Sequence, residues 1–211
     1  MDLKGLTINF LGDSITEGHG TTDEKNVFHQ IIKEKYGMEF ASNYGVGGTR
    51  IARQIVPTRE KTRYDMTFEL RADIMDRNAD AVVVFGGTND YGHGDAPFGT
   101  EDSEDVYTFC GAVNSLISKL TADFPSAKII FMTPIHRVNE TNPSEPDSKT
   151  LEDYVNAIRN ICKKRGIALI DLFEINPLDP EDVNLVPDGL HPSDEGHRVM
   201  AQVIAEELIK L

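Results

Sequence analysis

The sequence predicts one α/β domain of three layers, with a parallel sheet of about five strands between two layers of helices. Two observations predict this fold class. Short apolar runs alternate with amphipathic stretches along all 211 residues. The clearest run, residues 80–85, is rich in β-branched residues and suits a central parallel strand covered on both faces. No linker, repeat or low-complexity tract divides the chain, so residues 1–211 are expected to form a single domain.

Each expected strand is a short apolar run that stops at a glycine, a proline or a polar cluster. The runs are residues 6–11, 38–42, 80–85, 128–132 and 167–170. Because helices are expected between the strands, the flavodoxin-like strand order 2-1-3-4-5 is the natural choice. In that order the ligand site lies at the carboxyl ends of the strands, near strands 1 and 3.

Helices are expected where apolar residues recur at helical spacing. The clearest are residues 27–36, 106–120, 150–165 and 193–211. Gly37 and Gly166 are placed to cap the first and third of them at their C-termini, and Ser193 to cap the last at its N-terminus.

The remaining stretches are less regular. Residues 51–78 are interrupted at Pro57, and a helical face is expected after it from Met66, Leu70, Ile74 and Met75. Residues 91–100 and 172–187 are expected to be irregular. Residues 135–149 form a long polar excursion, which predicts a flexible rim or lid.

The composition excludes several classes of protein. A net charge of −14 and a pI of about 4.8 disfavour a nucleic-acid partner, which needs a cationic face. No apolar run approaches the roughly 20 residues of a membrane span. The two cysteines, Cys110 and Cys162, lie in expected helices and predict buried thiols, not a disulfide framework. Without a signal-like segment at the N-terminus, a cytoplasmic location is expected.

Polar clusters follow the first three expected strands. Gly12-Asp13-Ser14 follows the first, a glycine-rich segment from Asn43 to Thr49 follows the second, and Gly87-Thr88-Asn89-Asp90 follows the third. Neither phosphate-loop pattern fits the glycine-rich segment, since G-x-x-x-x-G-K-[ST] is absent and Arg50 replaces the last glycine of G-x-G-x-x-G. These ends would be adjacent in the expected sheet, so we expect them to form one site.

A serine hydroxyl needs a base to become a nucleophile. Of the six histidines, only His191 has an acid, Asp188, at a spacing that could orient its ring. The other histidines are expected to be ordinary surface or core residues. Acyl transfer also needs hydrogen-bond donors for the developing oxyanion. Candidates are the backbone N–H groups of Ser14 and Gly48 and the side-chain amide of Asn89.

The sequence resembles the SGNH (GDSL-type) hydrolases in four ordered blocks that span nearly the whole chain. The blocks are Gly12-Asp13-Ser14, residues 43–48, Gly87-Thr88-Asn89-Asp90 and Asp188-Gly189-Leu190-His191-Pro192. One departure is conservative, because Ile15 stands where many members have leucine. The G-x-S-x-G elbow of the α/β-hydrolase fold is absent, which disfavours that fold.

The resemblance implies an esterase or acylhydrolase that uses no metal and no cofactor. It implies that Ser14 is the nucleophile, His191 the base and Asp188 its orienting acid. It also implies that Gly48 and Asn89 donate to the oxyanion beside the Ser14 amide. Gly47 competes with Gly48, but the offset of Gly48 from Asn43 fits the family's pattern.

The substrate is expected to be a small-molecule ester. Residues 91–100 and 133–149 are expected to wall the pocket, with Asp13, Tyr91 and His136 as candidate substrate-binding residues. Their polar character favours small acyl groups, such as acetyl on a carbohydrate, over the long chains of a lysophospholipase or thioesterase.

Two alternatives come from other classes. A metal-dependent phosphoesterase would use Asp13, Asn89, Asp90 and histidines as ligands, but the Asp-x-His that such sites favour is missing near the first strand. An inactive binding module would keep the fold, although every catalytic position is filled.

Overall fold

The computed structural model describes residues 1–55 and 66–211. Within these ranges five parallel strands form one sheet in the order β2-β1-β3-β4-β5. The strands are β1 (Thr7–Gly12), β2 (Phe40–Gly45), β3 (Ala81–Phe85), β4 (Lys128–Met132) and β5 (Ala168–Ile170). The predicted fold class and strand order are confirmed.

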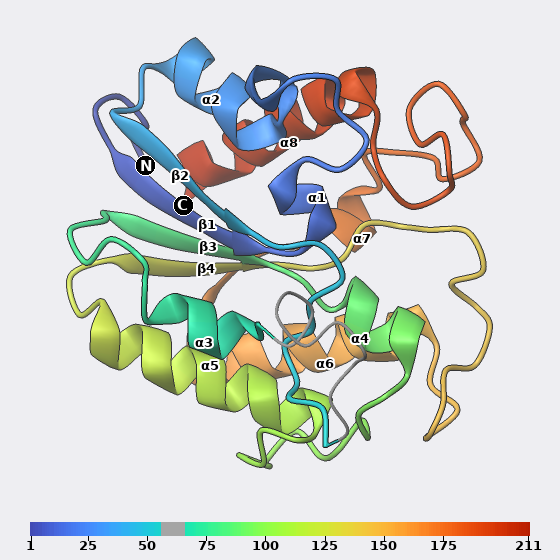
Figure 1. Ribbon diagram of the computed structural model, residues 1–211. Helices are drawn as coiled ribbons and strands as arrows, with labels where there is room; N and C mark the ends of the chain where they lie inside the picture. Colours follow the sequence, from blue (N-terminus) through green and yellow to red (C-terminus); the bar gives the residue numbers. More distant parts are fainter. Residues whose placement is uncertain (56–65) are drawn as a thin grey trace.

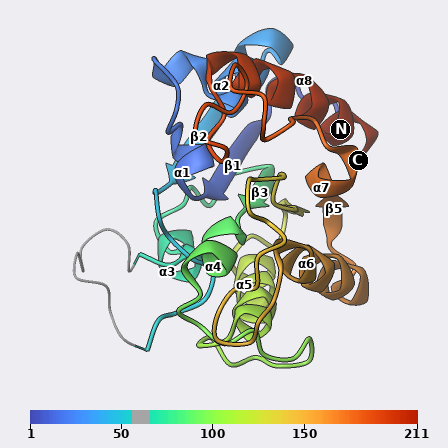
Figure 2. The same ribbon diagram turned by 90° about the vertical axis from the view of Figure 1, so that its right-hand side faces the viewer.

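Helices cover both faces of the sheet (Figure 1). On one face lie α2 (Phe28–Tyr36) and α8 (Asp194–Lys210), and on the other α3 (Phe68–Ala72), α5 (Phe109–Asp123) and α6 (Leu151–Arg165). Four short helical elements connect these layers: α1 (Ser14–Glu17), a 3₁₀ turn (Glu24–Asn26), α4 (Thr88–His93) and α7 (Leu172–Ile175). The two chain ends lie side by side near α8 (Figure 2), where the Met1 ammonium donates to the Leu208 carbonyl at 3.1 Å.

The core is divided by the sheet into two apolar clusters, and β3 contributes to both. Val82 and Val84 pack in the cluster with α5 and α6, whereas Val83 and Phe85 pack in the cluster with α2 and α8. All five residues of β3 are buried. A central strand with both faces covered cannot alternate between apolar and polar residues, which explains the continuous apolar run.

The expected helical face of residues 66–75 is wrong. Helix α3 is only five residues long, and Leu70 and Ile74 are 47% and 67% exposed. The buried positions are Phe68, Arg71 and Ala72, with Met75 beyond the helix. The expected apolar positions extend beyond the end of this short helix, so their helical spacing does not correspond to its buried face. Pro57 lies outside the described residues.

Other boundaries shift for identifiable reasons. The second strand runs over Phe40–Gly45 rather than residues 38–42, because its later half is polar and carries little apolar signal. Helix α5 begins at Phe109, where the Thr108 side chain caps it. Helices α4 and α7 occupy stretches expected to be irregular.

The expected caps and buried thiols are confirmed. Gly37 and Gly166 end their helices in the left-handed conformation, and the Ser193 side chain accepts from the Gly196 N–H. Cys110 and Cys162 are buried free thiols. Among the described helices, none combines the length and apolar character needed to cross a membrane.

Two buried histidines belong to the core rather than to a site. The His29 Nε2–H donates to the Thr16 carbonyl at 3.1 Å, and its ring stacks on Phe10. The His197 Nδ1 accepts from the Phe28 N–H at 3.2 Å. Burial lowers the pKa of both imidazoles from 6.5 to about 4, so both are neutral in the folded protein at pH 7.

This burial predicts a pH-dependent difference between the wild type and a His29→Gln variant. In the unfolded chain His29 takes up a proton below about pH 6.5, whereas in the folded protein it resists protonation until about pH 4. The stabilisation from neutral His29 is therefore complete above pH 6.5 and is lost as the pH falls toward 4. We expect the wild type to lose about 2 kcal/mol relative to the variant between pH 7.5 and pH 5.

Urea unfolding of both proteins at several pH values measures this double difference, which subtracts any pH-independent cost of the substitution. Parallel pH dependences of the two proteins would contradict a buried neutral His29.

Candidate active site

The register of the sheet brings the predicted site residues to one edge. Gly12 at the end of β1 pairs with Gly45 of β2 and with Phe85 of β3. Directly beyond these strand ends come Ser14, Gly48 and Asn89, and all three line one cavity of about 530 Å³. His191 lines the same cavity from the loop before α8. Segments from both ends of the chain therefore meet there.

Ser14, His191 and Asp188 form a continuous chain of hydrogen bonds. The Ser14 Oγ lies 2.9 Å from the His191 Nε2, and the His191 Nδ1 lies 2.7 Å from an Asp188 carboxylate oxygen. With the Nδ1 proton donated to Asp188, the Nε2 is free to accept the serine proton. This arrangement suits removal of a proton from Ser14 by His191.

Asp188 is held as an anion beside the imidazole. Partial burial by itself would raise its pKa, but hydrogen bonds from the His191 backbone, the His191 ring and the Leu190 backbone outweigh it and lower the pKa to about 2. An Asp188 carboxylate oxygen accepts from the His191 N–H at 2.7 Å and from the Leu190 N–H at 2.9 Å. The tight turn that makes them passes through Gly189, whose φ is 75° and whose absent side chain leaves room for Val138.

Three residues that line the cavity carry hydrogen-bond donors: Ser14, Gly48 and Asn89. The Ser14 N–H belongs to the first turn of α1, where amides have no partner within the helix. The Gly47 N–H donates to Glu17 at 2.8 Å, whereas the Gly48 N–H has no acceptor in the described part of the chain. This difference favours Gly48 over Gly47 as an oxyanion donor. Asn89 uses one amide hydrogen on the Thr49 carbonyl at 3.1 Å, which leaves the second for a ligand.

Asp90 fixes the segment that carries Gly48. Its two carboxylate oxygens accept from the Ile51 N–H at 3.0 Å and the Ala52 N–H at 2.9 Å. Burial raises the pKa of Asp90 to about 7, although these two hydrogen bonds oppose the rise. Because Asp90 follows Asn89 directly, α4 and the glycine-rich segment are held in one arrangement.

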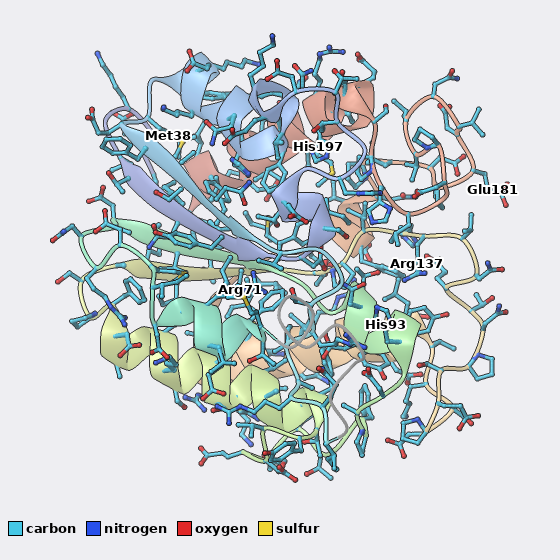
Figure 3. All side chains as sticks on the ribbon, viewed as in Figure 1. Met38, Arg71, His93, Arg137, Glu181 and His197 are labelled. Carbon is cyan, nitrogen blue, oxygen red and sulfur yellow. The ribbon has the colours of Figure 1, made fainter. Side chains whose placement is uncertain are left out.

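Arg71 was not singled out from the sequence, yet it ties the same strand ends together. Its guanidinium donates to the Gly12 carbonyl at 2.6 Å, to the Thr49 hydroxyl at 2.8 Å and to the Tyr44 carbonyl. Figure 3 shows it between the sheet and α3. The sequence could have indicated it only as an arginine at a core-facing helix position. The helical face expected from Leu70 and Ile74 did not include it.

The three candidate substrate-binding side chains do not line this cavity. Asp13 is buried and caps α1 by accepting from the Ile15 N–H at 3.0 Å. The Tyr91 hydroxyl lies 2.9 Å from the Asn142 carbonyl, in a neighbouring depression. His136 stacks on Phe173 with ring centroids 3.8 Å apart and contacts Glu140. Each side chain thus holds the protein's own structure at the edge of the site.

The segment expected to be a rim or lid is fastened to the body of the protein. The Val138 N–H donates to the Gly189 carbonyl at 2.9 Å, and the Ser144 hydroxyl to the Tyr91 carbonyl at 2.5 Å. Two further side chains line the cavity: Arg137 from this segment and His93 from α4 (Figure 3). Arg137 lies within residues 133–149, which the sequence predicts to wall the pocket, and its place after β4 follows the rule that singled out the other site residues.

The ligand set of the metal-dependent alternative is not assembled. Asp13 and Asp90 are buried, and their carboxylates hold backbone N–H groups. In the described part of the chain, one group of metal-capable side chains has ligand atoms within 4.8 Å of one another: His19, Asp188 and His191. A cation there would compete with Ser14 for the imidazole.

Several known proteins are similar to this chain over most of its length. The sequence pattern of the GDSL-like lipase/acylhydrolase family matches residues 10–199. An acetylxylan esterase of Geobacillus stearothermophilus is 23% identical, over 97% of this chain and 94% of its own length. One from Xylanibacter ruminicola is 25% identical over 95% of this chain, which spans only 42% of that relative. A crystal structure of a Lactobacillus plantarum protein is 28% identical with a TM-score of 0.82, and the match covers 98% of each chain.

The role of Asp90 predicts a loss of stability in an Asp90→Asn variant. The amide presents one N–H group where a carboxylate oxygen accepted a backbone N–H, so one buried donor loses its acceptor. We expect the free energy of unfolding to fall by about 1–3 kcal/mol at pH 8, as measured by urea denaturation. Asp73→Asn on the protein surface is the matched control, with an expected change of no more than about 0.5 kcal/mol. Equal losses in the two variants would contradict this role for Asp90.

Proposed function

We propose that this protein cleaves its ester substrate through an acyl-enzyme on Ser14. The chain belongs to the GDSL-like lipase/acylhydrolase family and is a carboxylic ester hydrolase. The observation that carries the proposal is the chain of hydrogen bonds from Ser14 through His191 to Asp188, which opens on the cavity of about 530 Å³. The backbone amides of Ser14 and Gly48 and the amide of Asn89 supply donors on the same side.

In the proposed reaction, the Ser14 Oγ attacks the ester carbonyl carbon while the His191 Nε2 takes the serine proton. Asp188 stabilises the imidazolium that forms. The carbonyl oxygen becomes an oxyanion, which accepts hydrogen bonds from the three donors. When the tetrahedral intermediate collapses, His191 gives its proton to the departing alcohol, and Ser14 carries the acyl group. His191 then deprotonates a water molecule, whose oxygen adds to the acyl carbon. The bond from that carbon to the Ser14 Oγ breaks, the acid leaves, and His191 returns the proton to Oγ.

For the substrate we propose a small acyl group, such as acetyl carried by a carbohydrate. Two relatives named as acetylxylan esterases support this choice. The polar side chains of His19, His93 and Arg137 in the cavity wall also suit a polyhydroxy alcohol better than a lipid chain.

The nucleophile is tested by labelling with a fluorophosphonate, which reacts with activated serines. We expect intact-mass analysis to find one adduct on the wild type and on Ser126→Ala, an exposed control, and none on Ser14→Ala. Turnover of p-nitrophenyl acetate is expected to fall by about 10⁴-fold or more in Ser14→Ala, in line with loss of a catalytic serine.

If the fluorophosphonate labelled Ser14→Ala as strongly as the wild type, the nucleophile would be a residue other than Ser14. Turnover that disappears with a chelator, with no adduct on the wild type, would favour the metal-dependent phosphoesterase. No adduct and no turnover would favour an inactive binding module.

The acyl preference is tested with p-nitrophenyl esters of increasing chain length. We expect kcat/KM to be highest for acetate and to fall by about tenfold or more by octanoate, because a longer chain would meet the polar side chains of His19, His93 and Arg137 in the cavity wall. An optimum at long acyl chains would instead favour the lysophospholipase or thioesterase alternative.

A further inference from the structure

Arg137 is a half-buried cation in the wall of the catalytic cavity without an ionic partner. It forms no ion pair with any residue in the described ranges 1–55 and 66–211, and Asp13 and Asp188 act on its charge only from a distance. Among the described residues, the guanidinium donates only from Nη1, to the Thr88 carbonyl and to the Thr88 hydroxyl, each at 3.2 Å. Its Nε is buried and has no acceptor among the described residues, and its Nη2 has none there either.

Arg50 and Arg71, which are the buried arginines in the described part of the chain, show what satisfied guanidinium groups look like in this protein. Arg50 pairs with the carboxylate of Asp95. Arg71 donates from all three of its nitrogens to oxygen atoms. Arg137 alone of these three keeps most of its five N–H donors without an acceptor in the described chain.

The guanidinium is nevertheless held in a defined place. It packs over the Tyr91 ring, with 5.5 Å between its central carbon and the ring centroid. On α4 the missing side chain of Gly92 leaves room for it, since a Cβ there would lie 2.7 Å from Nη1. Helix α4 also carries Asn89, so one short helix positions both the amide and the cation.

Arg137 stands where two hollows of the surface adjoin. It lines the cavity of about 530 Å³ that contains Ser14 and His191, and it also lines a depression of about 330 Å³ bounded by residues 138–145. Gly92 and His93 are shared by both hollows as well. A substrate attached at Ser14 can therefore extend past Arg137 into the depression.

Keeping a desolvated cation without a partner is unfavourable, and it is the more notable in a protein with a net charge of −14. A bound anion would supply the missing acceptors. We propose that Arg137 binds an anionic group of the ester substrate, so that the protein prefers esters that carry a carboxylate near the scissile bond. A carboxylate is planar and matches the guanidinium fork. This inference rests on the proposed esterase function and adds the charge of the substrate to it.

The first test compares matched esters on the wild type. Comparing mono-p-nitrophenyl glutarate with p-nitrophenyl butyrate tests the effect of a carboxylate on the acyl side. Comparing acetylated glucuronic acid with acetylated glucose tests the effect of a carboxylate on the alcohol side. We expect kcat/KM to be about 10- to 100-fold higher for the charged member of one of the two pairs, the range of a hydrogen bond to a charged group. The preference should shrink as salt is raised.

The second test uses Arg137→Met and Arg137→Lys with Arg198→Gln as the control. Arg198 is an exposed arginine on α8 that pairs with Glu195. We expect Arg137→Met to lose the preference for the charged ester, Arg137→Lys to keep part of it, and Arg198→Gln to keep all of it. Circular dichroism and thermal unfolding verify that each variant is folded.

Several outcomes would overturn the inference. Equal kcat/KM for both members of both pairs on the wild type would do so without any variant. If Arg137→Met lowered kcat/KM equally for charged and neutral esters, the guanidinium would instead act on the oxyanion that every ester forms. Failure of the esterase proposal is distinct, because it would abolish hydrolysis of neutral p-nitrophenyl acetate on the wild type.

Discussion

The close packing of α1 across the carboxyl ends of β1 and β2 is the contact on which the rest of the site depends. Two glycines permit it. A Cβ on Gly45 would lie 2.2 Å from the Glu17 N, and one on Gly12 would lie 1.9 Å from the Thr16 hydroxyl and 2.9 Å from the Phe85 carbonyl. Because nothing larger fits, Ser14 sits directly above the sheet, and Glu17 reaches the Gly47 N–H. Gly48 lines the cavity next to this contact.

Around this contact, buried charges are matched mainly by backbone dipoles rather than by opposite charges. Arg71 donates to carbonyls at the ends of the strands, while Asp13 and Asp90 accept from amides at the start of α1 and after the glycine-rich segment. Backbone partners cannot move without moving the chain, so these bonds fix loop geometry more firmly than ion pairs between flexible side chains would. Burial raises the pKa of Asp13 to about 6, which is consistent with a carboxylate that serves as a helix cap inside the protein.

The sheet and the residues at its edge were predictable from the sequence because both depend on local signals. Apolar runs that end in polar clusters located β1 and β3, and the strand order then brought Ser14, Gly48 and Asn89 together. What the sequence did not reveal depends on contacts between distant segments. Arg71 lies in the short helix α3, where the sequence pattern is mixed, and donates to carbonyls 27 and 59 residues away. Likewise, Tyr91 and His136 are polar residues near the site whose side chains turn to neighbouring loops.

The electrostatic layout of the cavity separates two tasks. Asp188 is half exposed, yet three hydrogen bonds keep it ionised, so its charge serves the His191 ring it contacts. In the wall of the same cavity, the Arg137 guanidinium packs over the Tyr91 ring and beside Gly92, and it has no ion-pair partner among the described residues. A cation that only needed neutralising would be served by a carboxylate such as the one that pairs with Arg50. Among the described residues no carboxylate pairs with the Arg137 guanidinium, since the neighbouring Glu140 accepts instead from the Arg137 backbone N–H at 3.0 Å. The proposed partner is therefore an anionic group of the substrate.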